Sequence, residues 1–133
     1  MLEAGVLIDT QGNPIYWHTP EGRSAGGLPN SFDLWDVIWE NRENLSGMAH
    51  SHPGSGHPSP SHTDVTTFAA IELALGRRLD WWIITSDQVA LYQWVGHNSD
   101  LRGFREQDRL WYTEREFGGV LPSWVPELLR RSA

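Results

Sequence analysis

The spacing of apolar and polar positions in the first third of the chain predicts two strands and a helix. Two runs that favour strands, Ala4–Asp9 and Ile15–His18, flank a turn-forming TQGNP segment and predict a hairpin. The next segment, Thr19–Asn30, has the composition of a loop. Ser31 is a residue type that caps helices, and apolar side chains after it recur at helical spacing. The predicted buried face of this helix consists of Phe32, Trp35, Ile38 and Trp39.

The middle of the chain alternates strands with a longer helix. Leu45–His52 predicts a strand, and the segment rich in glycine and proline after it predicts a tight loop. Ser61–Gly76 has helical periodicity and ends on glycine, a residue that commonly stops helices. Two further predicted strands, Leu79–Asp87 and Gln88–Gly96, meet near Ser86. The predicted buried face of the long helix consists of Val65, Phe68, Ile71 and Leu75.

The last part of the chain predicts two more helices. The first covers Phe104–Phe117, and the second covers Pro122–Ala133 and packs through Trp124 and Leu128. This order of strands and helices is typical of an α/β (mixed α+β) domain with a central mixed sheet flanked by helices. The 133 residues are 39% apolar and show no repeat or linker, so we expect a single domain spanning residues 1–133.

Composition and charge narrow the function classes. The formal net charge of −7 argues against a general nucleic-acid binder, which usually has a basic face. No apolar run reaches the roughly 18 residues of a membrane span, and the N-terminus lacks the basic start of a signal peptide. We therefore expect a soluble, cytoplasmic protein that binds neither nucleic acid nor membrane. The chain has no cysteine, so any transition metal must be held by histidine and carboxylate side chains.

The candidate chemistry lies in MAHSHPGSGHPSPSHTDV, residues 48–65. Side chains two positions apart on a strand point to one face, so His50 and His52 can converge on one ion. Asp64 falls in the first turn of the predicted helix, and the loop before it can fold back sharply. Two histidines and an aspartate are a ligand set for a catalytic zinc, which keeps its fourth position for water. Two other interpretations stay open: a polar loop without a metal, and a helix-capping role for Ser61 and Asp64.

The phrase HSHP, followed by a loop and then by PS, two residues and D, resembles the signature of the JAMM/MPN+ (JAB/Mov34-type) zinc metallopeptidases. The compact chain is similar to prokaryotic or phage members, and the resemblance implies a cytidine-deaminase-like MPN/JAMM domain. It also implies that His50, His52 and Asp64 bind Zn²⁺ and that Ser61 steadies the tetrahedral intermediate. It is best over Leu45–Trp94. The loop before Ser61 is one residue longer than the commonest spacing of the family, an insertion that a flexible loop absorbs.

In that family a glutamate on an early strand acts on the zinc water, just before a segment written E-x-x-G-L-L. Here Glu3 opens the first predicted strand and stands one residue closer to Gly5 than that pattern requires. We predict Glu3 as the catalytic acid/base, with Glu21, Glu40 and Glu43 as open alternatives. The family usually begins with a helix before this strand. This chain has none there, so we expect the C-terminal segment or a partner to close the edge beside Glu3.

The resemblance implies a metallopeptidase or isopeptidase whose substrate is a protein or peptide, such as the C-terminal glycine tail of a ubiquitin-like protein. Two alternatives stay open: a non-catalytic MPN-type scaffold, and a RadC-like JAB-domain protein of unclear chemistry, which LGRRLDWWII echoes. We expect His57 and His62 to be exposed. Several tryptophans could wall a substrate channel, although aromatic residues at helical spacing more often lie in the core. They are Trp17, Trp35, Trp39, Trp81 and Trp82.

Overall fold

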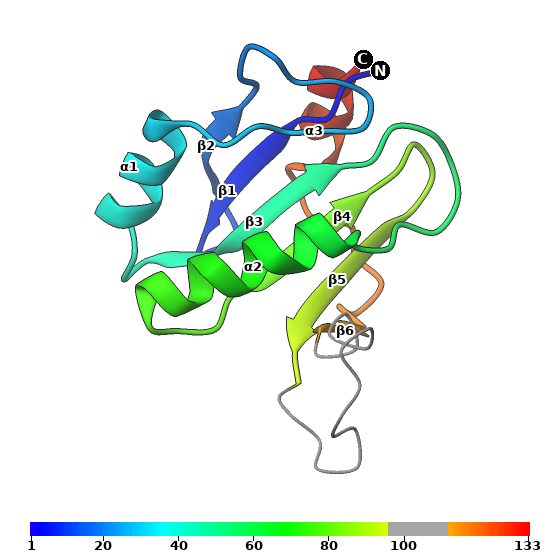
Figure 1. The fold of residues 1–133 in the computed structure, drawn as a ribbon. Helices are drawn as coiled ribbons and strands as arrows, with labels where there is room; N and C mark the ends of the chain where they lie inside the picture. The colour runs from blue at the N-terminus through cyan, green and yellow to red at the C-terminus, as the bar shows by residue number, and fades with distance from the viewer. Residues whose placement is uncertain (96–111) are drawn as a thin grey trace.

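A six-stranded sheet with helices on both faces forms the centre of the protein (Figure 1). The structure is a computed structural model that describes residues 1–95 and 112–133. The strands lie in the order β2-β1-β3-β4-β5-β6; β3 and β4 run parallel, and the other neighbouring pairs are antiparallel. This arrangement confirms the predicted mixed α/β class. The elements are β1 (Gly5–Asp9), β2 (Pro14–His18), α1 (Phe32–Glu40), β3 (Leu45–Ser51), α2 (His62–Leu75), β4 (Asp80–Ile84), β5 (Val89–Trp94), β6 (Tyr112–Arg115) and α3 (Val125–Ser132).

Side chains alternate across β1, so this strand contributes to two cores. Leu7 faces α1 and α2 and belongs to the same buried cluster as Leu34 and Phe68. Its neighbour Ile8 belongs to the cluster on the opposite face, together with Leu128 of α3. This period of two is the signature of a strand that is buried on both sides. The sheet is therefore the middle layer of three.

The α1 helix lies where the sequence predicts but turns a different face to the core. Leu34 and Ile38 are buried, whereas Phe32 is 91% exposed and Trp35 and Trp39 are partly exposed. The prediction of the buried face is therefore wrong except at Ile38. The nine-residue helix carries two apolar stripes, and only one of them can pack on the sheet. Leu34 and Ile38, four positions apart, form the stripe that does so.

The α2 helix has both predicted ends and connects the parallel strands β3 and β4, as a crossover of this kind requires. Ser61 is its N-cap, and Gly76 ends it in the left-handed conformation with φ 68°. Glycine adopts this conformation without the strain that a Cβ would cause. The predicted apolar face packs against the sheet, with two members buried and two partly buried: Val65 and Phe68, then Ile71 and Leu75.

A buried carboxylate, that of Glu72, fastens the far end of α2 to the sheet. Glu72 is 2% exposed. It accepts the backbone N–H of Leu79 at 3.0 Å, the indole N–H of Trp81 at 2.9 Å and the hydroxyl of Tyr112 at 2.6 Å. Arg78 forms an ion pair with it at 2.8 Å. Four donors on one carboxylate satisfy the requirement that a buried charge be paired and hydrogen-bonded.

The strand β6 corrects the prediction of a helix over residues 104–117. Tyr112–Arg115 pairs with the edge of β5, and Tyr112 is buried with its hydroxyl on Glu72. Both interactions join segments distant in the sequence, so the local periodicity does not contain them and the sheet overrides it. Residues 104–111 of the predicted helix lie outside the described residues.

The predicted C-terminal helix is confirmed as α3, which packs through the buried side chains of Trp124 and Leu128. Figure 1 shows α3 behind the sheet, beside the N-terminal end of the chain. The backbone N–H of Leu2 donates to the carbonyl of Ser132 at 2.8 Å. The C-terminal segment therefore contacts the chain beside Glu3, although β1 itself lies between β2 and β3 and has no free edge to close. In the part of the chain that the structure describes, no helix is both long and apolar enough to cross a membrane.

Candidate metal centre

The end of β3 carries both histidines of the candidate site. His50 stands opposite Gly5 of β1 and Ile83 of β4, and His52 follows the strand directly. The backbone N–H of His52 donates to the carbonyl of Ile84 at 2.8 Å, which prolongs the pairing with β4 past the end of the strand. The two imidazole rings therefore lie on the same side of the sheet, as their spacing predicts.

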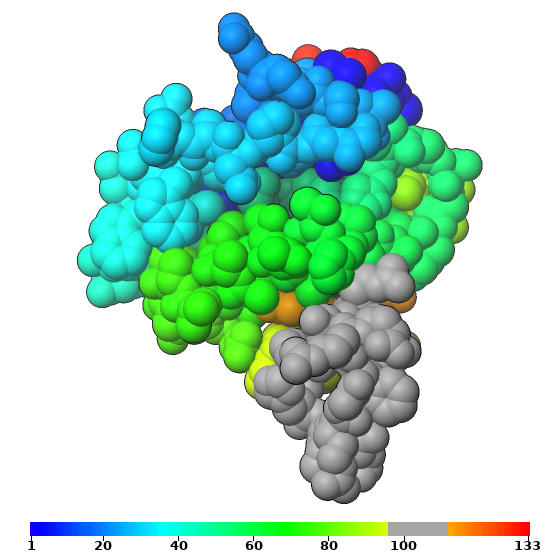
Figure 2. Space-filling model, viewed as in Figure 1, coloured from blue at the N-terminus to red at the C-terminus, as the bar shows by residue number. Residues whose placement is uncertain are grey.

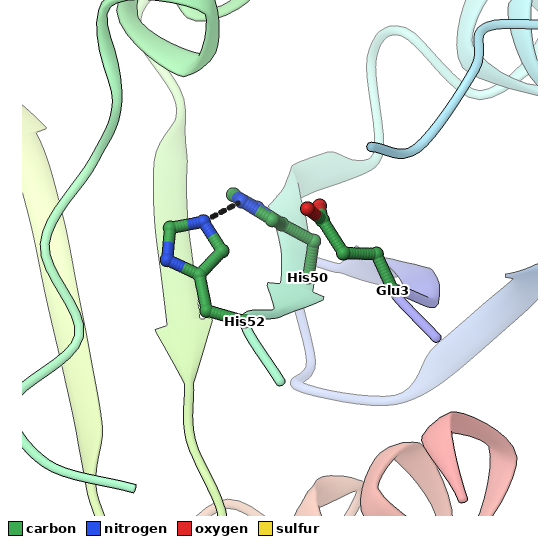
Figure 3. Close-up of side chains that lie close together, drawn as sticks. All are labelled: Glu3, His50 and His52. Carbon is green, nitrogen blue, oxygen red and sulfur yellow. Dashed lines mark hydrogen bonds between the residues drawn. The ribbon is translucent and has the colours of Figure 1, made fainter. Parts of the chain in front are cut away.

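The side chains of His50, His52 and Asp64 converge at this point. Nε2 of His50 and Nε2 of His52 lie 3.0 Å apart (Figure 3). Oδ1 of Asp64 lies 3.3 Å from Nε2 of His50, and Oδ2 lies 3.0 Å from Nε2 of His52. Ligand atoms bound to a tetrahedral zinc at about 2.0–2.1 Å stand about 3.3–3.4 Å from one another. The observed separations are at or somewhat below this value, so His50, His52 and Asp64 lie close enough together to share an ion.

Glu3 lies beside the histidines. One carboxylate oxygen of Glu3 and one ring nitrogen each of His50 and His52 all lie within 4.8 Å of one another, an arrangement that could hold a metal ion. Figure 3 shows the Glu3 carboxylate turned toward the His50 ring, and Glu3 is 8% exposed. Among the described residues, the three alternative glutamates are exposed and lie outside this group: Glu21, Glu40 and Glu43.

Ser61 and Asp64 form a capping box at the start of α2, as the capping interpretation predicts. The Ser61 hydroxyl accepts the N–H of Asp64 at 3.0 Å, and Oδ2 of Asp64 accepts the N–H of Ser61 at 2.9 Å. A carboxylate has about four lone-pair sites, so Asp64 can cap the helix and bind a metal at the same time. The Ser61 hydroxyl accepts the capping N–H with a lone pair, which leaves its own proton to donate.

The charges in the cluster shift the proton affinities of its members. The hydrogen bond to Asp64 raises the pKa of His52 above its usual value. Burial works to raise the pKa of Asp64, but the hydrogen bonds and charges of His50 and His52 outweigh it and hold that pKa well below its usual range. Burial raises the pKa of Glu3, against the opposing charges of the two histidines. In the metal-free protein the net effect is therefore a Glu3 pKa above that of a solvated glutamate.

The cluster opens into a pocket between α2 and the segment that precedes α1. Figure 2 shows this face, with α2 in green below the hollow. Met48, Phe68 and Trp81 form an apolar part of the pocket lining. His18 also lines it, and its Nε2 lies 2.6 Å from the carbonyl oxygen of Pro29. The sequence does not predict His18 as a pocket residue, because only the folded chain brings the carbonyl of Pro29 to its ring.

The two remaining histidines of the loop lie away from the metal cluster and are exposed, as predicted. Nε2 of His57 lies 2.8 Å from a carboxylate oxygen of Glu114 on β6. His62 is the first residue of α2 and points its backbone carbonyl to the Thr66 hydroxyl. Neither imidazole therefore belongs to the group of side chains that could hold a metal ion.

The tryptophans proposed as channel walls divide into two groups. Trp81 is 2% exposed and lines the pocket from the core, while Trp17 and Trp82 pack against the cluster under α3. The core interpretation is confirmed for Trp81, whereas Trp17 and Trp82 are partly buried beside that second core. Trp35 lines a neighbouring hollow between α1 and α2, and Trp39 is 46% exposed, so the α1 pair lies at the surface.

Comparison with known proteins identifies the fold. No curated protein matches the chain. The family model that describes prokaryotic homologs of the JAB domain matches residues 5–108, which include His50, His52, Ser61 and Asp64. The match begins after Glu3 and ends before α3. Because it covers most of the chain, and the six-stranded mixed sheet agrees with it, the chain belongs to the prokaryotic homologs of the JAB domain.

Proposed function

We propose that this protein is a zinc-dependent peptidase or isopeptidase. The observation that carries the proposal is the convergence of His50, His52 and Asp64, with Glu3 beside them. Two imidazoles and one carboxylate make up the protein ligands of many catalytic zinc sites, and in this proposal His50, His52 and Asp64 hold the ion. A bound zinc ion would acidify a water molecule and polarise the carbonyl of the substrate.

Glu3 is the acid/base in this proposal. Its carboxylate accepts a proton from the attacking water and delivers that proton to the leaving amine. Its position beside the two histidines supports this role, because an acid/base must lie within reach of the water that it deprotonates. A positioned acid/base typically contributes about 10²–10⁴-fold to the rate.

Ser61 stabilises the negative charge that develops on the carbonyl oxygen. Its hydroxyl proton is not used by the capping contact, in which the oxygen accepts the Asp64 N–H. It also stands at the N-terminus of α2, where the partial positive charge of the helix favours an anion. Donors aimed at such an oxygen typically contribute about 10²–10³-fold.

The substrate of this proposal is a protein or peptide with an extended tail, such as that of a ubiquitin-like protein. The pocket beside the cluster is lined on one side by α2 and on the other by the segment before α1. Small residues next to the scissile bond would let the backbone approach the cluster closely.

The test measures metal and hydrolysis separately. Protein loaded with zinc and freed of excess metal should carry about one zinc per chain in native mass spectrometry. His50→Ala and Asp64→Ala should lose that zinc, whereas Glu3→Gln should keep it. Hydrolysis is followed with peptides that end in Gly-Gly joined to aminomethylcoumarin, together with a quenched-fluorescence peptide library.

Glu3→Gln should lower turnover by about 10²–10⁴-fold without loss of zinc. Glu43→Gln is the matched control, because Glu43 is exposed and outside the cluster. A loaded protein without zinc would refute the metal assignment. Zinc binding without hydrolysis of any probe would favour the scaffold alternative over the peptidase.

A further inference from the structure

Glu3 lies two residues before the first residue of β1, and the backbone pairing with β3 reaches Ala4, whose carbonyl accepts the N–H of Ser51 at 3.0 Å. Hydrogen bonds from α3 and from the loop around Ser24 hold the residues before Ala4. The N–H of Leu2 donates to Ser132 of α3 at 2.8 Å, and the N–H of Glu3 donates to the carbonyl of Ser24 at 2.8 Å. The backbone around the candidate base is therefore fixed by tertiary contacts.

Arg23 joins the same segment to the last turn of α3. Its Nη1 donates to the carbonyl of Glu3 at 3.2 Å and to the carbonyl of Arg131 at 2.9 Å. One guanidinium thus bridges the residue that carries the carboxylate and the C-terminal end of a helix. That helix end carries partial negative charge, which a cation stabilises.

A pair of buried serines makes the second link, from α3 to the strand that carries the histidines. The hydroxyl oxygens of Ser51 and Ser132 lie 2.6 Å apart, and Oγ of Ser51 accepts the N–H of Ala4 at 3.0 Å. The Ser132 hydroxyl also donates to the carbonyl of Leu128 within α3 at 2.8 Å. Because the Ser132 proton goes to Leu128, the Ser51 hydroxyl donates its proton to Ser132 and still accepts the N–H of Ala4.

Ser51 stands between His50 and His52 and points to the face of the sheet opposite their rings, as residues on a strand alternate. Its side chain is 1% exposed, and that of Ser132 is fully buried. The residue between the two candidate ligands therefore holds the backbone next to Glu3, and α3 holds that residue in turn.

We infer that Arg23, Ser51 and Ser132 are positioning residues that set where the Glu3 carboxylate lies relative to the histidines. The inference rests on the proposed function, in which Glu3 is the base. It extends beyond the family match, because residues 5–108 include neither Glu3 nor α3. In this chain the C-terminal helix performs a task for the active site although it contributes no side chain to it.

The magnitude follows from the steep dependence of catalysis on geometry, since a misplacement of about 1 Å can lower a rate by about 10²-fold. Arg23→Ala removes both contacts of the guanidinium, and Ser132→Ala removes the hydroxyl that holds Ser51. Each variant should lower kcat on the order of 10–100-fold with KM changed by less than about twofold, the pattern of an interaction used only in the transition state. Arg23→Lys keeps a cation with several donors and should recover most of the loss.

Two readouts do not depend on hydrolysis. The zinc affinity of both variants, measured by competition with a chelator, should stay within about twofold of the starting protein, because neither residue contacts the ligand atoms. Amide hydrogen exchange at Ala4, followed by NMR, should accelerate in Ser132→Ala on the order of tenfold or more, because the acceptor of its N–H is released. The control is Arg130→Ala, since Arg130 is an exposed arginine of α3 that pairs with Glu127.

The inference is overturned if Arg23→Ala and Ser132→Ala change kcat no more than Arg130→Ala does. It is also overturned if kcat and zinc affinity fall together, since that would show a general loss of structure. If the unaltered protein hydrolyses no probe, the proposed function fails, but amide exchange still tests the structural link between α3 and the Glu3 segment. Unchanged exchange at Ala4 in Ser132→Ala refutes this link, and faster exchange supports it.

Discussion

Replacement of Glu72 by alanine should destabilise the protein by about 3–5 kcal/mol, because it removes the acceptor of several buried donors. The indole N–H of Trp81, the backbone N–H of Leu79 and the hydroxyl of Tyr112 would lose their partner. An unsatisfied buried donor costs about 1–3 kcal/mol, and relaxation of the cavity would recover part of the sum. The ion pair with Arg78 adds little to this figure, since the Arg78 side chain is 54% exposed.

Urea unfolding followed by tryptophan fluorescence measures this loss. Glu72→Gln keeps one carbonyl acceptor and should cost less, about 1–3 kcal/mol. Glu43→Ala is the control at an exposed site and should stay within about 0.5 kcal/mol. A loss below about 1 kcal/mol for Glu72→Ala, with an unchanged denaturant slope, would refute the reasoning that this carboxylate anchors α2 and β6.

Three further predictions concern pH, the α1 face and a close backbone contact. In metal-free protein, the pKa of His52 is higher in the folded state than its usual value of 6.5. Protonated His52 therefore stabilises the fold fully below pH 6.5, and this stabilisation is lost as the pH rises through the folded-state pKa. The melting temperature of the metal-free protein should therefore fall as the pH rises above 6.5. Zinc should reverse this trend, because it binds neutral imidazole. Calorimetry in the presence of a chelator or of zinc measures both melting temperatures. Phe32→Ser should change unfolding free energy by less than about 0.5 kcal/mol, whereas Ile38→Ala should cost about 2–5 kcal/mol; equal losses would refute the observed orientation of α1. Gly47→Ala should prevent stable folding in a thermal melt, because a Cβ there would overlap the backbone of Asp80 on the parallel strand; a normal melt would contradict the β3–β4 register.

The elements that the sequence predicts well are those whose signals are local. Ser61 and Gly76 are the cap and stop of α2 because of their own side-chain and backbone preferences, and both sit where the sequence places them. The spacing of His50 and His52 likewise follows from the period of a strand. Glu3 was harder to predict, because its proximity to the histidines depends on β1 pairing with β3.

The features that the sequence does not predict depend on long-range partners. Tyr112 belongs to a segment with helical periodicity, but pairing with β5 and a hydrogen bond to Glu72 hold it in a strand of the sheet. Glu72 itself looks like a solvated helix residue until Trp81 and Leu79 are brought to it. On α1, two apolar stripes compete for one interface, and periodicity alone does not rank them.

The capping role of Asp64, a residue that we also propose as a metal ligand, bears on how relatives of this protein can be interpreted. A chain that loses its metal would still gain helix stability from an aspartate at this position, because the capping box with Ser61 does not require an ion. Selection on folding alone could therefore preserve this part of the signature long after catalysis is gone. The side chains of His50 and His52 have no comparable structural role among the contacts described. These two histidines are therefore better markers than Asp64 of a relative that still binds a metal.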